Sequence, residues 1–425
     1  MELKAGCKQT EIGVIPEDWE IACLSQLAEL ITSGSRGWAK YYSDSGALFV
    51  RSQNVRDGRL DFTDNQFVNP PKNSEGSRTQ LKNLDLLITI TGNSVGNVAI
   101  VEQELGEAYI SQHVGLVRLS SPVLGKFICY FLSPNSSGNL QILASQSGQS
   151  KPGLTLKNIH DFWIALPPIH EQNAIVAALS DVDTLLAKLD ALIAKKRDLK
   201  QAAMQQLLTA QTRLPGFVGE WVNVALGDIA DSNQKWSFTG GPFGSNLKSS
   251  DYIDDGVRII QLQNIGDGEF HNDSKVFTTS KKADELLSCN IYPGEIILSK
   301  MGDPVARACI IPPHHERYLM CSDGIRLVVN PKKFNTYFIF LAINYPDFRS
   351  RAENAGTGST RKRIGLTELR NLEIFCPPLP EQIAIVTILS DMDAEITALE
   401  ARRDKTRTLK QGMMQELLTG KTRLI

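Results

Sequence analysis

The sequence predicts an α/β (α+β) protein that contains two copies of one mixed domain, each followed by one long helix. The first observation is an internal repeat: residues 164–214 return 210 positions later as residues 374–424, with roughly half of the aligned residues identical and no gap. Chance does not produce such a match, so we infer an internal duplication. The second observation is a heptad spacing of apolar residues in each copy, which predicts that the two helices form an antiparallel coiled coil. The expected result is a pseudo-twofold internal repeat.

The apolar residues of each repeat alternate steps of four and three, which is the pattern of a coiled-coil seam. A helix of about 40 residues is about 60 Å long and cannot be covered by one small domain, so its partner is most simply the other copy. The alternative is two independent surface helices, each packed on its own domain. The predicted seam residues are Ile175, Leu179, Val182, Leu186, Leu189 and Ile193 in the first copy and Ile385, Leu389, Met392, Ile396 and Leu399 in the second.

Both helix starts carry two prolines followed by a Glu-Gln pair, at 167–172 and 377–382. Proline suits a first helical turn, and a carboxylate there suits the helix dipole. Four basic residues fall on or near the seam, where a charge costs stability. We favour the interpretation that these long side chains reach solvent at the rim, and the alternative is that they fix the register. They are Lys196, Lys200, Arg403 and Lys410.

The sequence predicts domains at 1–163 and 215–373, separated and followed by helical segments at 164–214 and 374–425. Landmarks recur in both domains: Gln53 and Asn54 match Gln263 and Asn264, and a strand-like run before Gly92 matches one before Gly302. Alternating apolar residues, β-branched residues and Gly, Asn or Asp turns predict a mixed, mostly β-rich α/β domain. Helices such as 126–132 and 334–343 are expected to pack on it.

The two domains differ between these landmarks. Residues 33–42 read SGSRGWAKYY, whereas the corresponding residues 240–252 read GGPFGSNLKSSDY. A shared frame with different loops is expected when two copies of one scaffold read two different ligands.

The last residues, 421–425, are similar to residues 9–12 near the start, just as 212–214 lead into the second domain. We therefore expect neighbouring termini in a closed object, which requires the two long helices to run antiparallel.

Composition excludes several classes of protein. Lys and Arg number 45 against 47 Asp and Glu, so any nucleic-acid contact must be a local patch rather than a global positive charge. The seven cysteines show no CxxC spacing, and there is no signal peptide and no apolar run near 18 residues. These features predict a reduced, cytoplasmic protein without a membrane partner.

At this point the pattern resembles the specificity subunit of Type I restriction–modification enzymes. The resemblance covers essentially the whole chain: the entry IPEDW at 15–19, two variable domains, and PPxxEQ twice before a heptad helix that carries LKQ and LLT. One PPxxEQ string is a weak signal, whereas two at a fixed offset before heptads are a strong one.

The resemblance implies that each variable domain is a target-recognition domain that reads one half of a bipartite target in double-stranded DNA. It implies that the helices set the spacing between half-sites and dock two modification subunits. Those subunits use S-adenosylmethionine to methylate adenine, and a restriction subunit uses ATP and magnesium to translocate and cleave DNA. This chain itself is then expected to be non-catalytic, with no cofactor and no metal.

Candidates for DNA contact are side chains that pair with base edges or with phosphates. For each one, the alternative is a solvated turn residue or a hydrogen bond at the end of a strand. In the first domain we expect base contacts from Arg36, Lys40, Gln53, Asn54 and Asn93, and in the second from Asn246, Lys248, Gln263, Asn264 and Lys300. The expected phosphate contacts are Lys151, Arg361, Lys362 and Arg363.

The sequence also contains motifs that point to other chemistry but do not complete it. Residues 69–72 read NPPK and resemble the NPP-aromatic motif of amino-methyltransferases, but Lys72 stands where the aromatic residue should be. The glycine-rich run 356–360 lacks the ending of a phosphate-binding loop. His314 and His315 are adjacent, so they point apart and suit a turn better than a metal site. The competing function is a non-catalytic coiled-coil scaffold whose duplicated domains bind protein.

Overall fold

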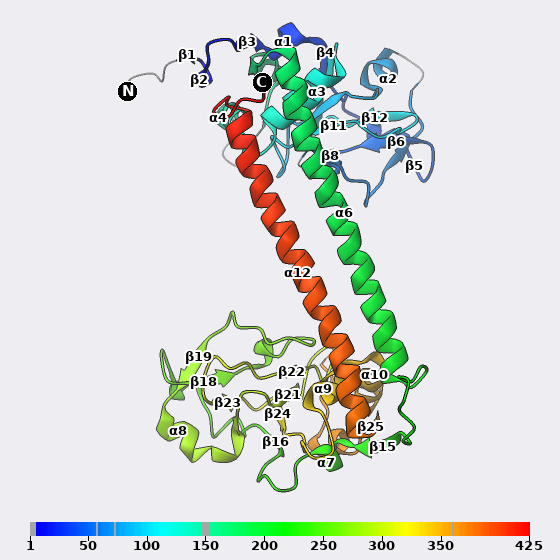
Figure 1. Cartoon of the computed structure of the whole chain (residues 1–425), viewed down its shortest axis with the longest axis vertical. Coiled ribbons are helices and arrows are strands. Elements are labelled where there is room, and N and C mark those ends of the chain that lie inside the picture. The colour runs from blue at the N-terminus through cyan, green and yellow to red at the C-terminus, as the bar shows by residue number, and fades with distance from the viewer. Residues whose placement is uncertain (1–5, 57, 72–73, 147–152, 359–360) are drawn as a thin grey trace. The chain divides into compact units, whose positions relative to one another are not determined.

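The computed structural model describes residues 6–56, 58–71, 74–146, 153–358 and 361–425. The chain divides into two compact units (Figure 1). Unit 1 contains Met1–Leu192 and Leu399–Ile425, and unit 2 contains Ile193–Ala398. Each unit therefore holds one domain and a part of both long helices.

Unit 1 is built from a four-stranded antiparallel sheet, a second four-stranded sheet and three strand pairs. The first sheet has the order β11 (Val98–Ile100), β10 (Leu86–Thr89), β13 (Val114–Leu119), β4 (Ala28–Ser33). The second has the order β12 (Ala108–Ile110), β6 (Ala47–Val50), β9 (Phe67–Val68), β5 (Tyr42–Ser43), with β12 and β6 parallel. The pairs are β1 (Cys7–Thr10) with β2 (Gly13–Pro16), β3 (Glu20–Cys23) with β14 (Trp163–Leu166), and β7 (Val55–Arg56) with β8 (Arg59–Leu60).

Short helices connect and cover these sheets. They are α1 (Leu24–Leu27), η1 (Trp38–Tyr41), η2 (Ser52–Asn54), α2 (Ser74–Thr79), α3 (Pro122–Leu132), α4 (Asn139–Ser145) and α5 (Leu156–His160). The first long helix, α6, spans Ile169–Leu208.

Unit 2 repeats the arrangement. One sheet has the order β16 (Phe238–Gly240), β24 (Gly324–Leu327), β21 (Ile296–Ser299), β22 (Ala308–Ile310). The other has the order β17 (Tyr252–Ile253), β19 (Val276–Thr278), β18 (Val257–Ile260), β23 (Tyr318–Met320), β20 (Asn290–Ile291), and β15 (Val222–Ala225) pairs with β25 (Glu373–Cys376). The helices are α7 (Leu226–Ile229), η3 (Ser249–Asp251), η4 (Leu262–Asn264), α8 (Ser280–Glu285), η5 (Leu287–Cys289), α9 (Thr336–Asn344), α10 (Pro346–Ala355), α11 (Leu366–Arg370) and the long α12 (Leu379–Leu417).

The strand register shows that both units share one scaffold. In unit 1, Leu86 of β10 lies opposite Ile100 of β11 and Val117 of β13. In unit 2, Ile296 lies opposite Ile310 and Leu327, and each of these numbers is 210 higher. Both central strands are buried along their whole length, as their unbroken apolar sequences require. The predicted mixed α/β duplication and the helices expected near 126–132 and 334–343, which are α3 and α9, are confirmed.

The long helices begin later than the repeated segments. Residues 164 and 374 lie in strands β14 and β25, which pair with β3 and β15, so each repeat is a strand followed by a helix. The domain boundaries at 163/164 and 373/374 remain predictions. Each boundary divides one of these two strands.

The helix segments run antiparallel in both units. In unit 1, Asp190 of α6 lies 3.7 Å from Arg403 of α12, and Asp183 lies 2.6 Å from Lys410, so numbers fall along one helix as they rise along the other. In unit 2, Lys196 pairs with Glu395 at 2.7 Å, and Lys200 pairs with Asp393. The alternative of two independent helices is therefore wrong.

The predicted seam is confirmed by burial. Ile175, Leu179, Leu189, Ile193, Ile385, Leu389 and Ile396 are buried, and Val182, Leu186, Met392 and Leu399 are half-buried. All four basic residues near the seam form ion pairs with acidic residues of the other helix. This arrangement favours the interpretation that the four basic residues fix the register of the two helices. It disfavours the interpretation that their side chains only reach solvent.

A buried carboxylate joins each helix start to its domain. In unit 1, Glu171 accepts hydrogen bonds from Trp19 Nε1 at 3.1 Å and from Arg423 Nε at 2.8 Å, and Arg423 also pairs with Asp18 at 2.6 Å. The first and last parts of the chain thus meet in unit 1, as the sequence predicted. In unit 2, Glu381 accepts hydrogen bonds from Trp221 Nε1 at 3.2 Å and Arg213 Nε at 3.1 Å.

We expect Glu171→Gln to destabilise unit 1 and Glu381→Gln to destabilise unit 2, because each removes the charge of a buried carboxylate that pairs with a partly exposed arginine. Chemical denaturation with hydrogen-exchange readout would localise the loss. The matched control is Glu395→Gln, whose exposed pair with Lys196 should contribute less than about 1 kcal/mol. Equal losses in all three variants would contradict the assignment.

The contacts of Glu171 and Asp18 with Arg423 also predict that the stability of unit 1 depends on pH in the acid range. Burial alone raises the pKa of Glu171, but hydrogen bonds from Arg423 and Trp19 outweigh it, so the net pKa is lowered, and the hydrogen bond from Arg423 lowers the pKa of Asp18. A lowered folded-state pKa adds stability above the ordinary value of about 4.3, and this stability is lost as pH falls through the folded pKa. The free energy of unfolding of unit 1 should therefore fall less steeply with decreasing pH in Glu171→Gln than in wild type.

Candidate nucleic-acid interface

In unit 2 the ends of several strands meet at one edge and are tied there by backbone hydrogen bonds. Gly241 N donates to Gly324 O at 2.8 Å, and Lys300 N donates to Asp323 O at 2.6 Å. Ile364 N donates to Lys300 O at 2.9 Å. The segments joined in this way, together with the loop that follows β18, form what we call the unit 2 edge: residues 240–248, 261–264, 300–302, 321–324 and 361–364.

The same bonds recur in unit 1. Gly34 N donates to Val114 O at 3.3 Å, Ile90 N to His113 O at 2.9 Å, and Leu154 N to Ile90 O at 2.8 Å. Apart from Gly34, every number is 210 lower than its counterpart. We call residues 33–41, 51–54, 90–93, 111–114 and 153–154 the unit 1 edge.

A glycine begins the variable loop in each edge because no side chain fits there. A Cβ on Gly34 would lie 2.3 Å from Ile110 O, and one on Gly241 would lie 1.7 Å from Cys321 O. At the other end, Gly46 and Gly256 have positive φ angles of +123° and +145°. The loop between these glycines is three residues longer in unit 2 than in unit 1, so a fixed frame carries different loops.

Most of the candidate DNA-contact side chains are exposed at these edges. In unit 1 they are Arg36, Lys40, Gln53 and Asn93, and in unit 2 they are Asn246, Lys248, Gln263, Arg361, Lys362 and Arg363. Lys300 is half-buried, and Lys151 lies outside the described residues. The fold therefore gathers residues that are far apart in sequence into one surface per unit.

Some of these side chains already have partners within the protein. Arg363 pairs with Asp323 at 2.8 Å, Lys362 Nζ donates to Glu353 O at 3.2 Å, and Lys40 lies over the Tyr41 ring at 4.8 Å. Gln263 donates to Gln261 at 2.9 Å. Because these groups are exposed, a phosphate or base edge can compete for them.

Asn54 and Asn264 fit the alternative of a structural hydrogen bond better than base contact. Both are buried, and both use the side-chain amide to hold a loop: Asn264 Nδ2 donates to His271 O at 2.9 Å, and Asn54 Nδ2 donates to Asp61 O at 2.8 Å. Each Oδ1 accepts a backbone N–H three residues earlier. We therefore assign both residues to the scaffold rather than to base contact.

Replacing Asn264 by alanine should lower the free energy of unfolding of unit 2 by about 1–3 kcal/mol, because buried carbonyl groups lose their donor. Thermal unfolding of Asn264→Ala against wild type measures this. The neighbouring exposed variant Gln263→Ala is the control and should be nearly neutral for stability. A neutral Asn264→Ala would contradict the scaffold role.

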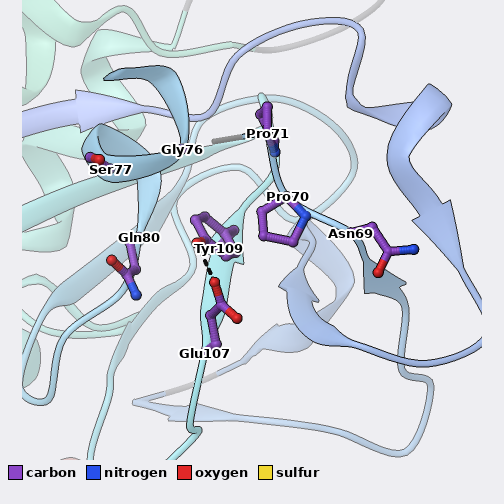
Figure 2. A pocket seen from close by; sticks show the side chains of 8 residues that line it. All are labelled: Asn69, Pro70, Pro71, Gly76, Ser77, Gln80, Glu107 and Tyr109. Carbon is purple, nitrogen blue, oxygen red and sulfur yellow. Dashed lines mark hydrogen bonds between the residues drawn. The ribbon is translucent and has the colours of Figure 1, made fainter. Parts of the chain in front are cut away.

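Unit 1 also contains a hollow of about 470 Å³ on the Asn-Pro-Pro motif, and Figure 2 shows its lining. Tyr109 OH donates to Glu107 Oε1 at 2.7 Å, and burial together with Glu107 raises the pKa of Tyr109 to about 12. The phenol thus stays protonated at neutral pH. Lys72, the residue that decides the methyltransferase resemblance, lies outside the described residues. The lining consists of Asn69, Pro70, Pro71, Gly76, Ser77, Gln80, Glu107 and Tyr109.

Some of the residues that could suggest other chemistry lie in the part of the chain that the structure describes. That part contains no group of three or more His, Cys, Asp or Glu residues placed to hold a metal ion. His315 lies edge-on against Phe277 and Tyr318, as a packed ring does, and burial lowers its pKa. None of the described helices has the length and apolar content that a membrane span needs.

Comparison with known proteins agrees with the duplicated layout. The family described as Type I restriction modification DNA specificity domain matches residues 16–195 and again residues 219–407. The chain belongs to this family. Two matches, one to each domain and the greater part of the helix that follows it, are what a duplicated specificity protein requires.

Relatives of this specificity protein match over nearly their full length. The putative type I restriction enzyme MjaX specificity subunit of Methanocaldococcus jannaschii is 27% identical, over 98% of this chain and 96% of the relative. The EcoKI specificity subunit of Escherichia coli is 23% identical, over 96% and 89%.

Solved structures show the same fold. A chain from a study of complex assembly and conformational transition of the type I R-M system matches with a TM-score of 0.61 and 18% identity, over 96% of this chain and 99% of the other. The S subunit from M. genitalium matches with a TM-score of 0.53 and 14% identity, over 98% of both chains.

Proposed function

We propose that this chain is the sequence-specific DNA-recognition subunit of a Type I restriction–modification complex, and that each edge reads one half of a bipartite target. The observation that carries the proposal is the edge itself, built twice by the same hydrogen bonds 210 residues apart and fitted with different loops. Two unlike readers in one chain suit an asymmetric, bipartite sequence. The specificity subunits among the relatives support the same function.

The chemistry of the edges suits DNA. Arg36, Asn246 and Lys248 are of the types that read guanine and adenine in the major groove. The run 361–363 offers two arginines and a lysine, which suit phosphates. These cations are local to the edges, which agrees with a chain whose overall charge is only −2.

The long helices are proposed to set the distance between half-sites and to dock two modification subunits. Exposed leucines support docking: Leu199 is 47% exposed and Leu409 is 59% exposed, and both belong to the repeated LKQ motif. The same exposed leucine recurs in both copies of the motif, which suits two copies of one partner. The methyl donor, S-adenosylmethionine, would be bound by those subunits, and ATP with magnesium by a restriction subunit, so this chain contributes recognition and not catalysis.

Leu199→Glu and Leu409→Glu should each remove one modification subunit from the complex, because a charge replaces an apolar contact. Native mass spectrometry of the co-purified complex would count the subunits: two in wild type, one in each variant and none in the double variant. Gln206→Glu, exposed on the same helix as Leu199, is the control and should keep both. Two subunits retained in the double variant would contradict docking through these leucines.

The competing function is a scaffold whose domains bind protein, which the near-neutral charge favours. Purification of the tagged chain from its cells tests between the two. Recovery of a modification subunit, with protection of a bipartite DNA sequence by the complex, supports the recognition subunit. Recovery of other proteins without any sequence-specific DNA binding supports the scaffold.

A further inference from the structure

One aromatic side chain on the unit 2 edge projects into solvent. Phe243 is 83% exposed, more than any other aromatic side chain in the described part of the chain. A phenylalanine ring normally gains stability by burial, so a ring this exposed on the candidate interface is a candidate for contact with a partner. The candidate DNA contacts considered from sequence were all hydrogen-bonding side chains, and for that reason they missed it.

The loop around Phe243 is held rigidly at its base. Gly241 is pressed against Cys321 O, where no Cβ fits, and Pro242, with its fixed φ, is buried. Asn246 N donates to Phe243 O at 2.8 Å, which closes a tight turn. The turn residues Gly244 and Ser245 are small, so the ring is the one bulky group at the tip.

Polar and cationic residues lie on the same loop as the ring and on the segments bonded to that loop. Asn246 and Lys248 lie on the same loop. The backbone of Gly241 is hydrogen-bonded to Gly324, and the neighbouring Asp323 accepts a backbone hydrogen bond from Lys300 and forms an ion pair with Arg363. Phe243 follows Gly241 by two positions, and in unit 1 Arg36 follows Gly34 by two positions. The two edges therefore present a guanidinium and a phenyl ring at the corresponding place.

We propose that Phe243 is a specificity-determining residue that packs against the 5-methyl group of a thymine in the major groove of the second half-site. The proposal rests on the proposed function. Amide and cationic side chains on the same loop match the donor and acceptor code of the major groove, and the apolar group displayed in that groove is the thymine methyl. Insertion of an apolar side chain between base pairs is instead typical of proteins that bind the minor groove. Arg36 gives the other half-site a guanine reader, which accounts for unlike halves.

The test uses the full chain in complex with its modification subunits and a duplex that carries the methylated target sequence. Each thymine of the second half-site is replaced in turn by uracil, which removes only the methyl group. Wild type should bind one of these duplexes about fourfold more weakly, the effect of losing one buried methyl. Phe243→Ala should bind the thymine duplex more weakly and lose its response to uracil, whereas Phe243→Leu should keep that response.

The matched control is Val218→Ala, an apolar residue 93% exposed outside the edge, which should bind as wild type does. The proposal is overturned if wild type responds to none of the uracil replacements, if the half-site contains no thymine, or if Phe243→Ala still responds to uracil. If Phe243→Ala binds more weakly but wild type shows no response to uracil, the ring stacks on a base instead. That outcome would also overturn the proposal. If wild type fails to prefer its target over a scrambled duplex, the proposed function itself fails.

Discussion

Grafting the variable loop of unit 1 into unit 2 is expected to change one half of the methylated sequence and leave the other half intact. Residues 34–46 would replace residues 241–256, since both loops run between glycines held at equivalent positions of the scaffold. Each base pair that loses its contact costs about 1–3 kcal/mol, so the original target should bind at least about fivefold more weakly. Sequencing that detects methylated adenine would report both halves.

The graft must respect the packing beneath each loop. Trp38 stacks on Phe49 with ring centroids 5.4 Å apart, whereas in unit 2 Leu247 packs in a cluster with Ile259 and Leu319. The graft therefore carries Trp38→Leu. The reciprocal graft into unit 1, with Leu247→Trp, is the control and should alter only the first half. A change in both halves, or in neither, would refute the assignment of one half to each unit.

Lengthening both helices is expected to widen the gap between the half-sites without altering either half. A copy of residues 186–192 would be inserted after Leu192, and a copy of residues 392–398 after Ala398, at the borders between the two units. Seven residues add about 10 Å of helix, which corresponds to about three base pairs of DNA. Methylated-adenine mapping would then show the same two halves about three base pairs further apart.

The paired insertion keeps four interhelical ion pairs each within one unit: Lys196–Glu395, Lys200–Asp393, Asp190–Arg403 and Asp183–Lys410. Insertion into α6 alone is the control: it puts the antiparallel seam out of register and should abolish methylation. A gap unchanged in the paired variant would contradict the spacing role of the helices.

The sequence predicted the large features because each has a strong periodic signal. The duplication is visible as identity at a fixed offset, and the seam from Ile175 to Ile193 repeats at heptad spacing, which the packing then confirms. The strands before Gly92 and Gly302 followed from their apolar runs, whereas their pairing partners were not predicted. What the sequence could not predict was the role of Glu171, which suited a helix dipole but binds Trp19 and Arg423. Those partners are 152 and 252 residues away.

The candidate interface was only partly predictable for a similar reason. A sequence shows which side chains can bind a base but not which are already occupied, so Asn54 and Asn264 looked like readers although each holds a buried loop. Phe243 carries no hydrogen-bonding group, and only its 83% exposure distinguishes it from a core residue. The convergence of Lys300, Arg363 and the variable loop depends on long-range backbone bonds that no local pattern encodes.

The most direct test of two unlike readers on one scaffold is genome-wide mapping of methylated adenines in cells with and without this chain. The expected result is one motif made of two different halves separated by a fixed number of unspecified base pairs, and it should disappear when the chain is deleted. A continuous or symmetric motif, or a motif that persists without the chain, would contradict the account.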